Sequence, residues 1–284
     1  MPGSVDDYLN DPETTEAEKA LIAACREGAP CELGGGKLPA EGATEPSVRA
    51  ALIRLLALEV TSLHEQGVFL MGALIIGQLD LSFARCRGEL FLGNCRFAEE
   101  PQMVQTELAQ LSLVGSHLPG LFARGAKIAG NMFLRGVTAT GTVDVNGARI
   151  EGQLAGEDAT LDGAGGWALN AQRAKVTQGM FLTRVMATGT VDLSGAEIGG
   201  QLAFDDASLD GGEGMALSAQ GAIAKRGILL GGLTATGTVD LNGAQIVGQL
   251  DFELATLEGG RGRGIQWSIP SGGGRTPVPK ANSC

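Results

Sequence analysis

Residues 187–202 read Ala-Thr-Gly-Thr-Val-Asp-Leu-Ser-Gly-Ala-Glu-Ile-Gly-Gly-Gln-Leu, and this phrase decides the fold. It occurs with few changes from Ala139 and again from Ala235, so successive copies begin 48 residues apart. A sequence period of about 20 to 50 residues is typical of a solenoid, in which each repeat packs against its neighbours. The repeat therefore predicts the class of fold.

A shorter period of 11 residues lies inside the long one. Met180, Val191 and Leu202 are 11 apart, and each copy of 48 contains four such units plus four more residues. Every unit holds two short strands of the form apolar-x-apolar, in which the middle side chain points away from the outer two. Two units supply four strands and four corners. We therefore predict a four-sided parallel coil of about 22 residues.

Pairs of small residues that contain glycine mark the corners of the predicted coil. Pairs such as Ser194-Gly195 allow a sharp turn, because glycine tolerates backbone angles that other residues avoid. The four additional residues fall at the same corner of every second coil, at 163–166 and 211–214. One coil cannot bury its inner face, so about eight coils are expected to stack into an all-β solenoid.

The first 66 residues are predicted to form an α-helical cap. Thr15 and Glu18 have the spacing of a capping box, and amphipathic patterns follow them and recur at 48–56. The open end of a solenoid offers these helices a surface to pack against. Gly- and Pro-rich residues beyond Trp267 break the repeat. We divide the chain into a cap at 1–66, a β-helix at 67–267 and a disordered tail at 268–284.

The segment Val191-Asp-Leu193-Ser-Gly-Ala196-Glu-Ile198 resembles two units of the pentapeptide-repeat family, whose motif is Ala-Asp/Asn-Leu-x-x. The resemblance implies a right-handed four-sided β-helix, the hand that parallel crossovers favour. Every second unit here has six residues, so the likeness is one of architecture. The repeats and helices together also resemble bacterial proteins often labelled membrane-associated oxidoreductases. That label implies a membrane and a redox cofactor, and the residues present support neither.

The register predicts the outward side chains of each side. Neighbouring coils lie about 4.8 Å apart, so equivalent residues form columns. Exposed apolar patches of several hundred Å² usually mark interfaces. We predict that one apolar column binds a protein partner or a second copy, unless a terminal segment of the same chain covers it. Its partner-binding residues are Phe133, Ala155, Phe181, Ala203 and Leu229, and Asp251 follows them.

A second column suggests an alternative function. Some pentapeptide-repeat proteins mimic DNA, and Asp144, Asp192 and Asp240 form an acidic column here. These carboxylates would be about 9.6 Å apart, two coil spacings, whereas duplex DNA carries one charge per about 1.7 Å. The adjacent column begins with the basic residues Lys127 and Arg149. A nucleic-acid-mimicking regulator is therefore the second hypothesis, and the labelled oxidoreductase is the third. A threonine column similar to those of ice-binding solenoids is interrupted by a methionine.

No catalytic, cofactor or metal site is predicted. Residues 163–168 have the letters of a dinucleotide fingerprint, but that motif needs a preceding strand and a following helix, and here it falls at a corner. The two histidines, His64 and His117, and the five cysteines show no metal-binding spacing. Cys86 and Cys95 are expected to face inward. The predicted function is a non-catalytic scaffold for protein interaction or self-assembly.

Charge and targeting signals limit the possible ligands and cellular locations of the protein. Residues 1–65 carry −7 of the net charge of −11, so the remaining 219 residues are close to balanced, which argues against direct binding of nucleic acid. The start of the chain shows no signal-peptide pattern, and no apolar run reaches the roughly 20 residues of a membrane span. We expect a cytoplasmic protein with reduced thiols. Association with a membrane surface stays open.

Overall fold

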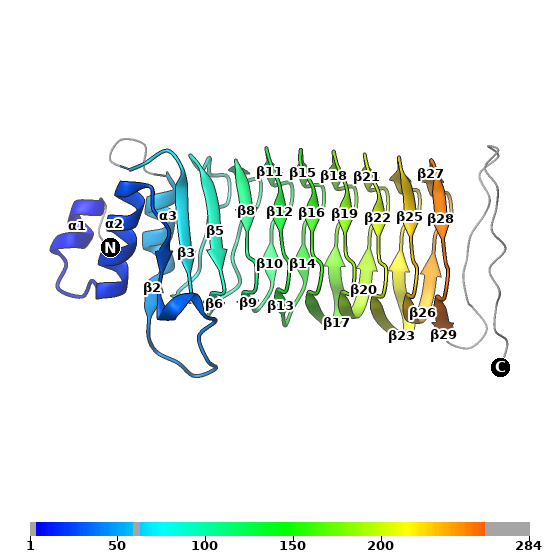
Figure 1. The fold of residues 1–284 in the computed structure, drawn as a ribbon, viewed down its shortest axis with the longest axis horizontal. Coiled ribbons are helices and arrows are strands. Elements are labelled where there is room, and N and C mark those ends of the chain that lie inside the picture. The colour runs from blue at the N-terminus through cyan, green and yellow to red at the C-terminus, as the bar shows by residue number, and fades with distance from the viewer. Residues whose placement is uncertain (1–3, 59–62, 259–284) are drawn as a thin grey trace.

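The computed structural model describes residues 4–58 and 63–258 (Figure 1). These residues form a parallel β-solenoid of about nine turns with about 22 residues per turn, which confirms the predicted architecture with one coil more than the eight expected. The helices gather at the N-terminal end, and the coils stack away from them towards the C-terminus. The predicted tail at 268–284 and the predicted end of the β-helix at Trp267 lie outside the described residues.

The N-terminal segment contains the predicted helices and two strands besides. Helix α2 (Glu16–Glu27) begins at Thr15, whose side chain and that of Glu18 form the predicted capping box. Helix α3 (Ala50–Leu58) starts later than predicted, because β2 (Ser47–Arg49) joins the next coil as a strand. The remaining elements of the segment are α1 (Val5–Asn10), β1 (Cys31–Glu32) and the 3-10 helix η1 (Gly34–Gly36). The first coil therefore begins inside the segment expected to be helical.

Sheet A forms one side of the solenoid and faces the viewer in Figure 1. All of its strands pair in parallel and in register with the next coil. Its members after β1 are β3 (Gly67–Met71), β5 (Glu89–Gly93), β8 (Gln110–Ser112), β12 (Met132–Phe133), β16 (Leu154–Ala155), β19 (Met180–Phe181), β22 (Leu202–Ala203), β25 (Gly227–Leu229) and β28 (Gln249–Asp251).

Sheet B covers the next two sides, because several of its strands continue around a corner. After β2 it contains β4 (Leu74–Ile76), β6 (Arg96–Phe97), β9 (His117–Leu118), β10 (Leu121–Phe122), β13 (Thr138–Ala139), β14 (Val143–Asp144), β17 (Thr160–Asn170), β20 (Met186–Asp192), β23 (Ser208–Ser218), β26 (Thr234–Asp240) and β29 (Thr256–Glu258). Sheet C forms the fourth side from β7 (Glu107–Leu108), β11 (Lys127–Ile128), β15 (Arg149–Ile150), β18 (Lys175–Val176), β21 (Glu197–Ile198), β24 (Ile223–Ala224) and β27 (Gln245–Ile246).

The additional residues of alternate coils form the predicted corner insertions. Strands β17 and β23 continue through them, and the pairing of β17 with β20 shifts between Asp162 and Trp167. The shorter corner of the following coil requires Gly189, which has φ of +106°. A Cβ atom at this position would lie 2.5 Å from the carbonyl oxygen of Gly166. The insertion and the tight corner therefore depend on each other through close backbone packing.

Inward side chains build one continuous aliphatic core. Met180 and Leu182 are buried on either side of Phe181, which is partly exposed on the outer surface. The same alternation places Val191 and Leu193 inside. This is the register that the sequence pattern predicts.

Two neighbouring substitutions test that register. Leu182→Ser should lower the free energy of unfolding by about 3 kcal/mol or more, because it opens a cavity and buries a hydroxyl. Phe181→Ser should lower it by about 1 kcal/mol or less, since the ring is on the outside. Urea denaturation followed by circular dichroism measures both. A larger loss for Phe181→Ser than for Leu182→Ser would invert the assigned faces.

Candidate interaction surface

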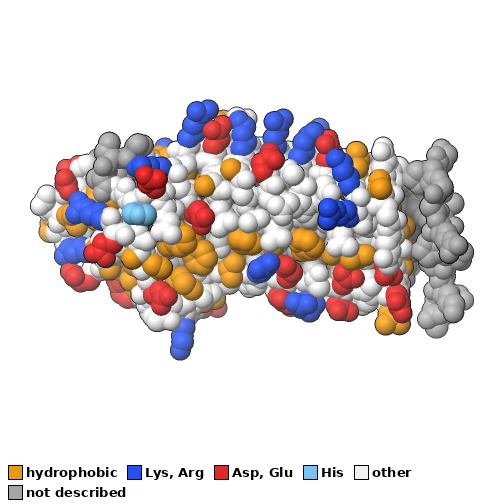
Figure 2. Space-filling view, turned by 45° about the horizontal axis from the view of Figure 1, so that its top comes forward, with side chains coloured by type: hydrophobic (Ala, Val, Ile, Leu, Met, Phe, Trp, Pro, Cys, Tyr) orange, Lys and Arg blue, Asp and Glu red, His pale blue; other side chains and the backbone are white. Residues whose placement is uncertain are grey.

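The five predicted partner-binding residues occupy consecutive coils of sheet A. Phe133 pairs with Ala155, which pairs with Phe181, and the series continues through Ala203 to Leu229. Figure 2 shows hydrophobic side chains in a band along the solenoid. The structure therefore brings the predicted residues together in one column.

The members of this column differ in exposure. Phe133, Phe181 and Leu229 are partly exposed, whereas Ala155 (0% exposed) and Ala203 (4%) are buried. Phe181 lies along its own strand, since a Cβ atom at Gly179 would be 2.6 Å from its ring. Any contact on this face would therefore be made mainly by the large side chains, and the alanines act as spacers.

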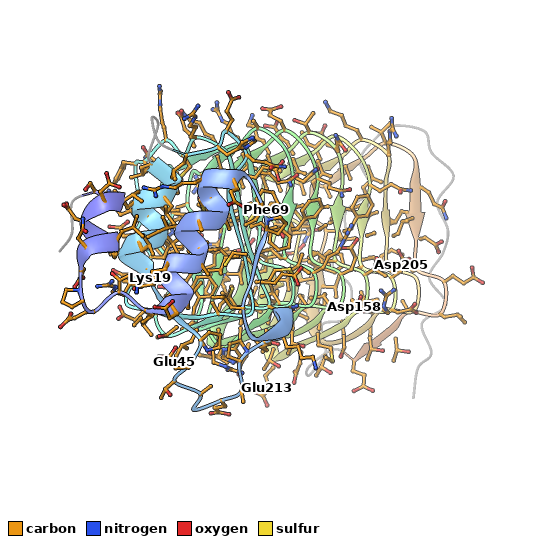
Figure 3. The ribbon with its side chains drawn as sticks, turned by 60° about the vertical axis from the view of Figure 1, so that its left-hand side comes forward. Lys19, Glu45, Phe69, Asp158, Asp205 and Glu213 are labelled. Atoms are coloured by element: carbon orange, nitrogen blue, oxygen red, sulfur yellow. The ribbon has the colours of Figure 1, made fainter. Side chains whose placement is uncertain are left out.

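The column continues towards the helical cap through Phe69, Phe91 and Ser112. Phe69, labelled in Figure 3, stacks on Phe91 with ring centroids 5.7 Å apart and ring planes 10° from parallel. The regular repeat of the sequence does not extend to these residues, because the spacing falls to 21 between Phe91, Ser112 and Phe133. Following the larger interval upstream from Phe91 to Phe69, which is 22, would have found the pair. We define the apolar stripe as Phe69, Phe91, Ser112, Phe133, Ala155, Phe181, Ala203 and Leu229.

One edge of the apolar stripe is charged. Arg135 donates to Glu157 at 2.8 Å, and Arg184 donates two bonds to Asp158 at 2.7 and 2.8 Å. The bonds from Arg184 hold the pKa of the Asp158 carboxyl below its usual value. Asp205 lies further along the same edge, towards the C-terminal end in Figure 3. We call this edge the charged rim and define it as Arg135, Glu157, Asp158, Arg184 and Asp205.

The opposite edge of the stripe is polar and mostly uncharged. Gln110 donates to Glu89 at 3.0 Å, and Asn131 donates to Gln110 at 3.2 Å. Asn131 also accepts a bond from the backbone N–H of Gln153 at 3.0 Å. We call Gln110, Asn131, Gln153 and Gln201 the amide rim. An apolar centre between polar rims is the usual composition of a protein interface.

The acidic column differs from its expected character as an exposed face. Asp144 is 1% exposed, Asp192 is 9% exposed and Asp240 is 3% exposed. Arg124 donates to Asp144 and Gln172 donates to Asp192, each at 2.6 Å and from the preceding coil. Neighbouring side chains therefore cover these carboxylates, and the column does not display them as a row of phosphates would be displayed.

Basic side chains gather on sheet C, along the upper edge of Figure 2. Lys127 pairs with Glu107 at 2.9 Å, and Lys175 pairs with Glu197 at 2.7 Å. Arg149 lies between them and is exposed. Exposed pairs of this kind contribute little stability and leave a surface of mixed charge.

Arg49 forms the densest polar cluster of the helical cap. Its guanidinium donates to buried Glu18 at 2.7 and 2.8 Å and to Asp11 at 3.2 Å, and it lies 4.7 Å from the Tyr8 ring centroid. These bonds raise the pKa of Arg49. The charge of Arg49 is thus satisfied within the chain, and we interpret the cluster as one that holds α1, α2 and β2 together.

Residues with catalytic side chains are scattered. Within residues 4–58 and 63–258, no three His, Cys, Asp or Glu side chains are grouped so that they could hold a metal ion. His117 lies on β9, and burial lowers its pKa. The dinucleotide-like letters at 163–168 lie within β17, where no helix follows them. Of the helices described, none combines the length and apolar character that crossing a bilayer requires.

Comparison of the chain with protein-family models, with curated proteins and with solved structures found no match.

Burial makes the described cysteines poor nucleophiles. Desolvation raises the pKa of Cys25 and Cys95 to about 12 and that of Cys31 and Cys86 to about 11. Since the thiolate is the reactive form, the folded protein should react very slowly with a thiol reagent at pH 8. Ellman's reagent measures this in a Cys284→Ser variant, because Cys284 lies outside the described residues. Four thiols should react after addition of denaturant, and fast reaction of any thiol in the folded protein would contradict the burial.

Proposed function

We propose that this protein is a non-catalytic scaffold that uses the apolar stripe to bind a protein partner or a second copy of itself. The observation that carries the proposal is the row of partly exposed rings on sheet A between two polar rims. The described part of the chain has four partly exposed phenylalanines in this one column, Phe69, Phe91, Phe133 and Phe181, and Leu229 continues it.

Rigidity supports this function. Every strand of sheet A is bonded to coils on both sides, apart from those at the ends, so the backbone loses little freedom on binding. The rings of Phe69 and Phe91 are already stacked, and the guanidinium of Arg135 lies 5.2 Å from the Phe133 ring centroid. Pre-ordered aromatic side chains are the usual energetic anchors of interfaces.

The two other hypotheses have less support. A nucleic-acid mimic requires displayed carboxylates, and those of Asp144, Asp192 and Asp240 are covered. For an oxidoreductase, the described residues offer no group of three His, Cys, Asp or Glu side chains that could hold a metal ion. We also propose that this protein is cytoplasmic, that its coils are related to pentapeptide repeats, and that it is bacterial. The unpaired cysteines Cys25, Cys31 and Cys95 support the reducing compartment, and the four-sided coil supports the likeness.

Paired substitutions on two faces test the proposed function. Phe133→Ser together with Phe181→Ser should abolish association measured by sedimentation velocity and by pull-down from the cells that produce the protein. The matched control is Trp167→Ser with Met186→Ser, which removes side chains that are 41% and 55% exposed on sheet B. The control variant should associate like the original protein.

Melting temperatures of both variants must stay close to that of the original protein, which shows that the coil is intact. If the stripe variant keeps all homotypic and heterotypic association, the stripe is not the interface. If the control variant loses the same association, the interface lies on sheet B.

A further inference from the structure

We infer that the occupant of the apolar stripe is a second copy of this chain, packed antiparallel with stripe against stripe. The inference rests on the proposed function and deepens it by naming the partner and its register. In this arrangement a two-fold axis passes between the coil of Ala155 and the coil of Phe181, parallel to the strands. Each coil then faces the coil at the same distance on the other side of the axis in the second copy.

Charge order along the charged rim is the first ground. In four successive coils this edge carries Arg135, then Glu157 and Asp158, then Arg184, then Asp205 and Asp206, so the sign of its charge alternates from coil to coil. When a row with an even number of alternating charges is turned end to end, every position meets a charge of the opposite sign. The axis therefore sets Arg135 opposite Asp205 of the second copy. It likewise sets Asp158 opposite Arg184 of the second copy.

The atoms needed for these new pairs remain accessible. The bond from Arg135 to Glu157 uses Nε of the guanidinium, and within the described residues its terminal nitrogens make no further hydrogen bond. Asp205 is partly exposed and has no ion-pair partner among the described side chains. Both arginines of the row are thus paired within their own copy, Arg135 with Glu157 and Arg184 with Asp158. Asp205 is the acidic group without an ion-pair partner, and the terminal nitrogens of Arg135 stay free to donate to it across the axis.

Size order along the stripe is the second ground, and it is independent of charge. Large and small side chains alternate from Ser112 to Leu229. The same axis places Phe133 opposite Ala203, Ala155 opposite Phe181 and Ser112 opposite Leu229. One coil further out, Phe91 lies opposite Asp251, so the contact of stripe on stripe runs from Ser112 to Leu229. A shift by one coil would instead place large side chains opposite each other and bring like charges together on the rim. Size and charge therefore select the same register.

The remaining edges are compatible with this packing. A two-fold axis parallel to the strands makes the amide rim meet the amide rim, and amide groups can both donate and accept hydrogen bonds. The same edge of the stripe continues beyond the charged rim with Val114 towards the cap and Gly231 towards the C-terminus. These two uncharged residues face each other across the axis. Because the contact is isologous, it closes as a dimer and does not propagate into a fibre.

Charge reversal tests the register directly. Sedimentation equilibrium of the full chain should show a monomer–dimer equilibrium. Arg135→Asp alone and Asp205→Arg alone should each weaken the dimer at least tenfold, because each places like charges together at two symmetric positions. Mixing the two variants should restore association to within about threefold of the original protein, because every opposed pair is again of opposite sign. Arg173→Asp, an exposed charge reversal at a corner away from sheet A, is the matched control and should change nothing.

The outcomes separate this inference from the proposed function. A protein that stays monomeric at millimolar concentration would overturn the dimer, as would single variants that dimerise normally or a mixture that fails to recover. Stripe-dependent capture of a different protein could persist in that case, and the proposed function would stand. Loss of both would overturn both.

Discussion

Stacking of each coil on the next through parallel, in-register strands is the constraint on which the rest of the structure depends. It requires equivalent residues to recur at equivalent places, so an inward position stays inward along the whole solenoid. Met132, Leu154, Met180 and Leu202 form one inner column for this reason. The same rule acts on the outer surface, where it turns a repeated residue into a continuous feature.

Outer columns therefore have properties that single residues lack. An isolated exposed phenylalanine is unremarkable on a protein surface, but a series of them on one flat sheet forms a strip. The alternation of coil types makes that strip periodic, since Phe133 and Phe181 come from one type and Ala155 and Ala203 from the other. Size and charge then share a two-coil period, which is what makes the face complementary to its own reverse.

Hydrogen bonding between coils gives the polar columns a different role. Asp144, Asp192 and Asp240 each accept bonds from their own corner and from the preceding coil. A carboxylate held in this way satisfies backbone donors and fixes the corner, so it is better understood as part of the stack than as a recognition surface. The Arg49 cluster likewise satisfies buried polar groups and joins elements at the cap, where α1, α2 and β2 meet.

Much of this protein is determined by sequence alone, because a strict repeat transfers the geometry of one coil to all others. The spacing of Met180, Val191 and Leu202 was sufficient to place the core, the corners, the insertions and the column from Phe133 to Leu229. Three features needed the tertiary structure. Coverage of Asp192 and Ala155 depends on how side chains of adjacent coils lie over them, and the extension to Phe69 and Phe91 depends on coils whose length departs from the repeat. Strands β1 and β2 form because the first coil must offer its backbone bonds to the second, a long-range requirement that local pattern does not carry.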